Sequence, residues 1–274
     1  MTDDALLRAV LAAPDDDAPR LVYADWLEER GDPARAAFIR VQVELSHPPV
    51  DYAKRFRLMQ TERTLLRANR DAWTAWLPAW AEAREFRRGF LEGIRCEAGD
   101  FISRADEVRH RTPLSSVQLD GKEELAVTLF RTRSLDGLRT LTLSLPIPAG
   151  VWSHLAECPV LGQLRDLTLN SKGPPGEMVD ALIESVGLSN LRTLRLTWCT
   201  LGDEHSARLV AHPWVARLRT LDLRNNHIAD EGGRAIAESP HLEGLELLNL
   251  RGNPLADTWV AGLLRRRFGG RVRF

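Results

Sequence analysis

The feature that most constrains the fold of this chain is a leucine pattern, L-x-x-L-x-L, that recurs through its second half and beyond. Its copies begin at Leu114, Leu138, Leu164, Leu191, Leu218 and Leu245. The last four copies are 27 residues apart, and a weaker copy precedes the series at Leu91, Ile94 and Cys96. Each copy begins with alternating apolar residues, as a strand requires, and continues into a helix-like segment. One strand and one helix cannot bury their apolar faces alone, so the copies are predicted to stack around a shared leucine core.

These copies resemble leucine-rich repeats over residues 90–274, and their length resembles the ribonuclease-inhibitor-like class. The resemblance implies an α/β fold: a horseshoe-shaped solenoid with a parallel sheet on its concave face and helices outside. The family also places Asn, or sometimes Cys, three residues after the last leucine, where the side chain bonds backbone between coils. Asn226 and Asn253 occupy this position, Cys199 lies 27 residues before Asn226, and Lys172 interrupts the row. Cys199 is therefore interpreted as structural rather than as a nucleophile.

Residues 1–46 are predicted to form three short helices, with carboxylates concentrated at their starts and ends in the stretch PDDDAPRLVYADWLEERGDP, residues 14–33. Acidic residues at a helix start accept hydrogen bonds from unpaired backbone N–H groups, so the run 15–17 is interpreted as capping the second helix and Asp32 as beginning the third. Asp25 lies in mid-helix and is expected to bond an arginine or a backbone group. The alternative is a metal-dependent enzyme or regulator that uses these carboxylates together with a histidine.

The same segment carries a second resemblance. Leu6-Leu7, Asp15 to Asp32 (DDDAPRLVYADWLEERGD) and 37–42 (AFIRVQ) are similar to the bacterial repeat-companion domain, a short N-terminal module found ahead of leucine-rich and other repeats. The resemblance implies an architecture and no activity: a helical domain over 1–46, a helical, Trp-rich bridging segment over 47–89, and the repeats over 90–274. The aromatic residues of the bridging segment are predicted to cover the open apolar end of the first coil.

Charge, cysteine content and hydropathy limit the function and the cellular compartment that can be expected of this chain. The 37 basic and 38 acidic residues nearly cancel, which argues against a chain that works mainly by gripping nucleic acid or an anionic membrane. Three cysteines, odd in number and far apart, indicate a reducing compartment. No apolar run is long enough to span a bilayer, and the start of the chain lacks a secretory signal, so a cytoplasmic monomer is expected. The arginines of residues 265–274 (RRRFGGRVRF) leave nucleic-acid binding as an alternative, although a final helix and a closing strand at 271–274 are favoured.

The leading functional hypothesis is a non-enzymatic interaction or scaffold protein that binds a protein partner on the concave face. Residues between the leucines point outward from each strand, and they are small in the early coils and charged in the later ones. The predicted partner-binding residues are Arg195, Trp198, Asp222, Arg224, Asn249 and Arg251. Arginine and tryptophan are the residues that most often anchor protein interfaces. No catalytic residue, metal ligand or cofactor is predicted.

Overall fold

The structure is a computed structural model of the chain that describes residues 2–47, 51–171, 173–185 and 187–274. Lys172 lies outside these ranges, and so do residues 48–50 of the predicted bridging segment. Within the described residues the fold is α/β, and nine strands follow one another in chain order in a mostly parallel sheet. The chain divides into two compact units, Met1–Cys96 with Arg104–Ser116 (unit 1) and Glu97–Ser103 with Val117–Phe274 (unit 2). The domain limits at residues 46 and 89 stay a prediction.

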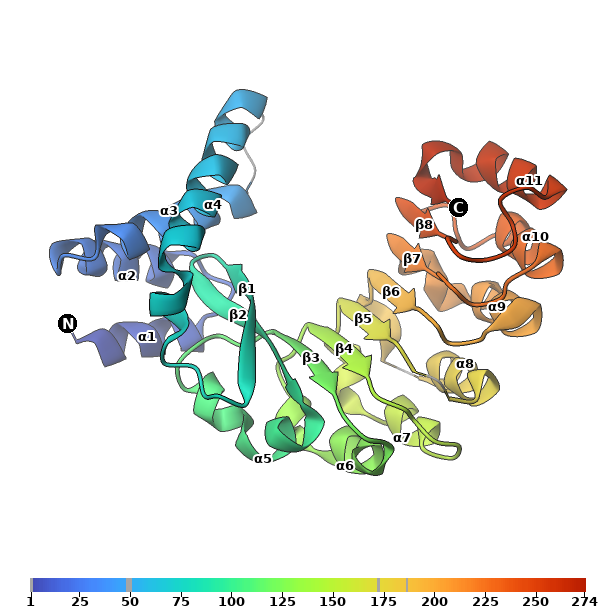
Figure 1. Cartoon of the computed structure of the whole chain (residues 1–274), viewed down its shortest axis with the longest axis horizontal. Coiled ribbons are helices and arrows are strands. Elements are labelled where there is room, and N and C mark those ends of the chain that lie inside the picture. Colours follow the sequence, from blue (N-terminus) through green and yellow to red (C-terminus); the bar gives the residue numbers. More distant parts are fainter. Residues whose placement is uncertain (1, 48–50, 172, 186) are drawn as a thin grey trace. The chain divides into compact units, whose positions relative to one another are not determined.

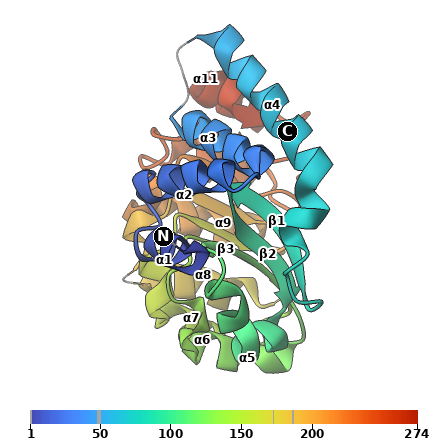
Figure 2. The ribbon, with the colours of Figure 1, turned by 90° about the vertical axis from the view of Figure 1, so that its left-hand side faces the viewer.

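Unit 1 begins with helices. They are α1 (Asp3–Ala12), α2 (Ala18–Glu29), α3 (Pro33–Ser46) and α4 (Tyr52–Thr74). The three helices predicted over residues 1–46 are confirmed, and α3 packs between α2 and α4 (Figures 1 and 2). Asp32 Oδ1 accepts a hydrogen bond from Arg35 N at 3.0 Å, and Asp16 Oδ1 accepts one from Ala18 N at 2.9 Å, as capping requires. The prediction is wrong for Asp17, whose side chain makes no bond to the start of α2.

The bridging segment 47–89 is not helical throughout, which corrects the prediction. Its last part is a strand, β1 (Ala81–Arg87), which pairs antiparallel with β2 (Phe90–Glu97). Arg88 and Gly89 connect the strands with φ values of 45° and 87°. Two consecutive residues with positive φ form the two-residue hairpin turn that matches the natural twist of a strand pair. A Cβ atom at position 89 would overlap α3, so the turn also requires glycine for space.

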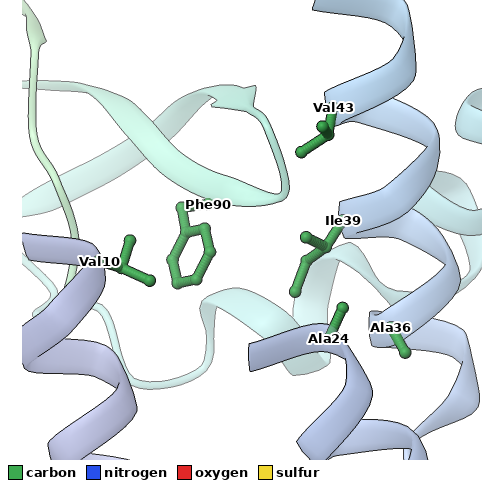
Figure 3. Packing of buried hydrophobic residues seen from close by; sticks show 6 residues of the cluster. All are labelled: Val10, Ala24, Ala36, Ile39, Val43 and Phe90. Atoms are coloured by element: carbon green, nitrogen blue, oxygen red, sulfur yellow. The ribbon is translucent and has the colours of Figure 1, made fainter. Parts of the chain in front are cut away.

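The apolar core of unit 1 joins the helices to the hairpin. Val10, Ala24, Ala36, Ile39 and Phe90 are buried against one another, with Val43 beside them (Figure 3). Val10 comes from α1, Ala24 from α2, Ala36 and Ile39 from α3, and Phe90 from the start of β2. Segments more than 50 residues apart in the sequence therefore share one core.

The aromatic residues of the bridging segment pack inside unit 1. The Trp73 ring lies 4.8 Å from the Phe38 ring and 6.4 Å from the Phe86 ring, measured between centroids. Trp80 Nε1 donates to Glu107 Oε2 at 3.1 Å. That these rings also cover the first coil stays a prediction.

Helix α5 (Ala98–Arg109) follows β2, and unit 2 then repeats strand and helix. Its strands are β3 (Ser116–Asp120), β4 (Thr140–Ser144), β5 (Asp166–Leu169), β6 (Thr193–Leu196), β7 (Thr220–Asp222), β8 (Leu247–Asn249) and β9 (Val272–Arg273). Its helices are α6 (Ala126–Arg131), α7 (Trp152–Ala156), α8 (Pro175–Glu184), α9 (Gly202–Ala211), α10 (Asp230–Glu238) and α11 (Trp259–Phe268). Short 3₁₀ turns lie at Glu123–Leu125, Arg133–Leu135, Pro159–Gly162, Leu188–Asn190, Pro213–Arg217 and Gly269–Arg271.

The register of the sheet in unit 2 is the register of the leucine pattern. Leu167, Leu194, Leu221 and Leu248 are direct neighbours on consecutive parallel strands, and each is fully buried. The helices α6 to α11 lie along one side of these strands, so the leucines point toward them and the residues between the leucines point away (Figure 1). The predicted closing strand is confirmed as β9, next to β8.

Candidate functional site

Outward-facing side chains form rows across the last strands of unit 2. Arg195, Asp222, Asn249 and Arg273 are register partners on β6, β7, β8 and β9. Arg224 and Arg251 extend a second row, two residues further along their coils. Because neighbouring strands are about 4.8 Å apart, four strands bring the first row within roughly 15 Å. We call Arg195, Trp198, Asp222, Arg224, Asn249, Arg251 and Arg273 the strand face.

Asp222 is the acidic member of the strand face, and it is engaged within the face. Its carboxylate accepts from Arg224 Nε at 3.0 Å and from Asn249 Nδ2 at 3.3 Å. Only 4% of Asp222 is exposed, whereas the sequence alone placed it on the surface. Asp222 therefore holds Arg224 in position and has little surface of its own to offer.

The other arginines of the strand face have their charges unengaged. Within the described residues, the guanidinium groups of Arg195, Arg251 and Arg273 make no hydrogen bond or ion pair. Arg251 and Arg273 are exposed and Arg195 is half-buried. Three cations thus project from the coils of β6, β8 and β9, near a single buried carboxylate on β7, which makes the face positively charged although the whole chain is nearly neutral.

Trp198 has a backbone conformation that its side chain does not favour. Its φ is 60°, and 62% of the residue is exposed. The equivalent positions one and two coils later are Asn225, with φ 56°, and Gly252, with φ 72°. Asn and Gly tolerate this left-handed region, whereas a bulky residue there is an outlier that costs about 1–2 kcal/mol. Trp198 N donates to Arg224 O at 3.3 Å, so the backbone of Trp198 lies beside that of Arg224.

A row of buried side chains supports the turn that carries Trp198. Asn226 Oδ1 accepts from Cys199 N at 2.9 Å, and Asn226 Nδ2 donates to Leu196 O at 2.6 Å. Asn253 repeats these bonds one coil later, to Asn226 N at 3.0 Å and Leu223 O at 2.9 Å. The predicted role of both asparagines is confirmed.

Cys199 occupies the same position in the coil before Asn226. Its Sγ donates to Leu169 O at 3.3 Å, at the same sequence offset that Asn226 spans to Leu196. Burial raises the pKa of the thiol to about 11. A buried thiol that stays protonated is a poor nucleophile, which fits the structural interpretation of Cys199.

The sequence of these coils matches a known family of repeats. A family model described as Leucine Rich repeat matches residues 187–204 and 218–237. These matches support a leucine-rich repeat protein. Such repeats point to protein interaction in general terms, and the matched residues include Trp198 and Arg224 of the strand face. No match was found among curated proteins.

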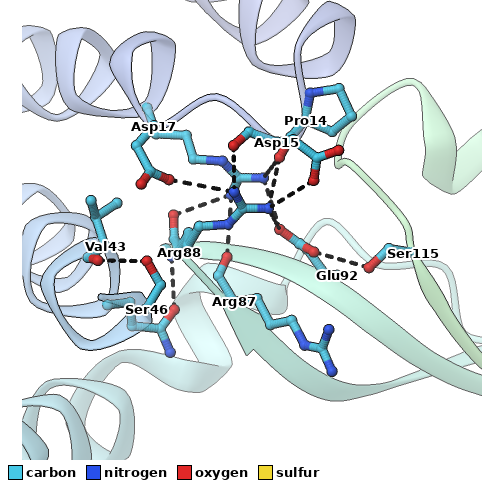
Figure 4. A network of polar contacts seen from close by, with 12 residues as sticks. Pro14, Asp15, Asp17, Val43, Ser46, Arg87, Arg88, Glu92 and Ser115 are labelled. Atoms are coloured by element: carbon cyan, nitrogen blue, oxygen red, sulfur yellow. Dashed lines mark hydrogen bonds and ion pairs between the residues drawn. The ribbon is translucent and has the colours of Figure 1, made fainter. Parts of the chain in front are cut away.

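The carboxylates that open α2 belong to a polar network, not to a cluster of their own (Figure 4). Arg20 is fully buried, and its Nη2 donates to Glu92 Oε1 at 2.8 Å. Ser115 Oγ donates to the other oxygen of Glu92 at 2.9 Å. Arg88 lies 3.4 Å from Asp17, between Nη1 and Oδ1. The network ties the start of α2 to the hairpin within unit 1.

The remaining carboxylates of the proposed metal or catalytic alternative are also engaged elsewhere. Asp25 Oδ1 accepts from Arg40 at 2.7 Å, which confirms that this mid-helix carboxylate bonds an arginine. Glu28 accepts from the same guanidinium. Among the residues that the structure describes, no three His, Cys, Asp or Glu side chains are grouped so that they could hold a metal ion. In the same ranges no helix has the length and apolar character needed to cross a bilayer.

Three of the arginines near residue 270 donate hydrogen bonds to backbone carbonyls. Arg267 donates to Ala237 O at 2.5 Å, and Arg271 Nη1 donates to Leu245 O at 2.7 Å. Arg265 donates to Ala256 O at 3.4 Å, and its guanidinium lies 4.8 Å from the Phe274 ring centroid. These three side chains secure the last coil, which favours the structural interpretation of the basic stretch.

Sequence reasoning missed two features. The residue after the first leucine of the pattern is arginine in four consecutive copies, and three of these arginines line a polar pocket of 680 Å³ with Asn190 and Gln163. This periodicity was visible in the sequence. The second feature is a pocket around Arg35 in unit 1. No sequence pattern could have revealed it, because its walls come from segments far apart in the chain.

Proposed function

We propose that this chain is a non-enzymatic interaction protein whose strand face binds an acidic segment of a partner protein. The observation that carries the proposal is the set of unengaged guanidinium groups at Arg195, Arg251 and Arg273, in the coils of β6, β8 and β9. The general link between leucine-rich repeats and protein interaction supports the same conclusion.

The chemistry of the strand face favours carboxylates. A guanidinium group presents its N–H donors in a planar fork that fits a carboxylate with two parallel hydrogen bonds. Asp222 already orients Arg224 in the free protein. The Arg224 side chain therefore loses less conformational entropy when a partner binds. An extended acidic segment that crosses the strands could meet one arginine per coil.

Trp198 supplies the apolar part of the proposed interface. Exposed tryptophan beside arginine is the combination that most often dominates binding energy in protein interfaces. The unfavourable φ at Trp198 places an aromatic ring where the later coils have a small residue. Strained backbone of this kind is retained at sites that use it.

We also infer the finer architecture that the sequence resemblances imply. The parallel sheet forms the concave side of a horseshoe, and residues 1–46 are the N-terminal companion domain of a bacterial cytoplasmic protein. The helices of unit 1, the order of the strands and the repeat matches support this inference.

The decisive experiment compares two charge-matched double variants. Partners captured from the native host by the wild-type chain are measured by calorimetry against Arg195→Glu/Arg251→Glu. We expect this variant to bind at least 30-fold more weakly, about 2 kcal/mol, and to lose most of the salt dependence of binding. The control is Arg234→Glu/Arg266→Glu, which makes the same charge change on exposed residues of α10 and α11. Equal affinity of both variants for the partner would move the interface away from the strand face.

A further inference from the structure

Unit 1 contains a pocket of 470 Å³ that the proposed function does not use. Its apolar walls are formed by Leu7, Tyr23, Leu27, Trp73, Trp76 and Phe90. They come from α1, α2, α4, the residues just after α4, and β2, so the pocket lies against the core shown in Figure 3. Its volume is within the range of sites that enclose small molecules, and aromatic walls with a few polar groups are typical of such sites.

Arg35, on α3, lines this pocket with an unsatisfied guanidinium group. Its Nη1 is buried and has no hydrogen-bond partner among the described residues. The group is enclosed by aromatic rings, with its Cζ 4.7 Å from the Trp73 centroid, 5.4 Å from Phe86 and 5.8 Å from both Phe38 and Phe90. Burial lowers the pKa of Arg35 to about 10, and the nearby Tyr23 and Asp32 oppose this effect only in part.

The two carboxylates of the pocket are committed to other donors. Tyr23 donates its hydroxyl hydrogen to Asp3 Oδ1 at 2.6 Å, and burial raises the pKa of Tyr23, so this hydroxyl stays protonated. Asp32 Oδ1 accepts from the backbone N–H of Arg35 and caps α3. Neither carboxylate forms an ion pair with the Arg35 guanidinium. Arg111 is a second cation of the pocket wall, with its Cζ 6.0 Å from the Trp76 ring centroid.

We propose that this pocket binds a small organic monocarboxylate with an aromatic or alkyl body. The carboxylate would accept the free N–H groups of Arg35, which supplies the hydrogen bonds that the buried guanidinium lacks. The apolar body would pack against Tyr23, Trp73 and Phe90, whose rings favour flat or slender groups. The proposal is independent of the strand face, because every wall of the pocket belongs to unit 1.

The test uses the full chain and three acids, phenylacetate, 3-phenylpropanoate and indole-3-acetate, each paired with its neutral amide. Calorimetry should show saturable, one-to-one binding of at least one acid, with its amide at least tenfold weaker. Arg35→Leu should abolish the preference for the acid. Arg40→Leu is the matched control on the same helix, because Arg40 pairs with Asp25 and Glu28 and does not line the pocket. Absence of binding by all three acids, or equal binding of acids and amides, would overturn the proposal.

A second measurement separates a ligand-binding Arg35 from a structural one. Replacing an unpaired buried cation by leucine removes a desolvation cost, so Arg35→Leu without ligand should melt at or above the wild-type temperature. A structural role in the aromatic cluster predicts the opposite sign. A melting temperature more than about 5 °C below wild type would contradict the proposal even if an acid bound.

Discussion

Arg20 and Glu92 form a buried ion pair that joins α2 to β2. The distance between Nη2 and Oε1 is 2.8 Å, and the side chains are 0% and 5% exposed. Arg20 also donates to Pro14 O at 2.8 Å and to the carbonyls of Arg87 and Arg88, both at 3.2 Å. Burial lowers the pKa of Arg20, and the charge of Glu92 opposes this effect. One side chain of α2 thus fixes the loop before the helix and the turn of the hairpin.

Removal of Glu92 should destabilise the fold strongly. Glu92→Ala leaves Arg20 buried without its counter-ion, and we expect the free energy of unfolding to fall by about 3–5 kcal/mol. Urea denaturation measures the loss. The control is Glu85→Ala, which removes the partner of Arg87 in a half-exposed pair and should cost less than about 1 kcal/mol. Similar losses in the two variants would show that the pair is not effectively buried in solution.

Asn226 should be the least replaceable residue of the repeat turns. Asn226→Ala deprives the buried backbone groups of Cys199 and Leu196 of their partners, and a loss of about 3 kcal/mol or more is expected. Asn249→Ala removes two long bonds of 3.3 Å, one to Asp222 and one from the exposed backbone N–H of Arg251, and should stay within about 1 kcal/mol. Chemical denaturation of both variants tests the difference. Equal stabilities would mean that water replaces the bonds of Asn226.

Cys199 should make the fold sensitive to alkali. Its pKa of about 11 exceeds that of a free thiol, about 8.5, so the unfolded chain releases the proton first as the pH rises. Stability from this group is complete below about pH 8.5 and declines up to about pH 11. Over that range the wild type should lose about 3 kcal/mol more than Cys199→Ala, in which the other titrating groups are unchanged. Parallel stability curves for the two proteins would show that the thiol is not shifted.

Trp198 should be replaceable with a gain in stability. Trp198→Asn introduces the residue found at the equivalent position of the next coil, and it should raise the free energy of unfolding by about 1 kcal/mol. Trp259 is equally exposed, at 62%, and begins α11 with negative φ, so Trp259→Asn is the matched control and should bring no gain. Thermal and urea unfolding of the two variants measure whether Trp198→Asn is stabilised and Trp259→Asn is not. A loss at Trp198 would mean that the indole contributes packing that outweighs the backbone strain.

The repeat part of the fold was predictable because its determinants are local and periodic. The leucine spacing alone places Leu194, Leu221 and Leu248 side by side, and the same period identifies the bonding role of Asn226. Where the coils have equal length, residues with the same bonding role recur at a constant spacing of 27, and this spacing can be recognised in the sequence.

Unit 1 was less predictable because its determinants converge from distant segments. The strand Ala81–Arg87 follows a tryptophan-rich segment that was interpreted as helical. The turn after it needs a positive φ at Arg88, and arginine is not a residue type that indicates such a turn. Arg20 lies near the start of α2, and its buried partner Glu92 is 72 residues away in the sequence. The isolation of Arg35 depends on rings from α3, α4 and both strands of the hairpin. No single window of sequence contains that information.

The bonds of Asn226 and Asn253 determine the order in which the coils of unit 2 should unfold when the chain is pulled. Each asparagine side chain bonds the backbone of the preceding coil. When the last coil detaches, only its bonds to the coil before it are broken, and the earlier coils keep theirs. Pulled from its C-terminal end, the array would peel one coil at a time. Each coil of 27 residues releases about 90 Å of extended chain, so an optical-trap record would show regular steps of that length, not one rupture.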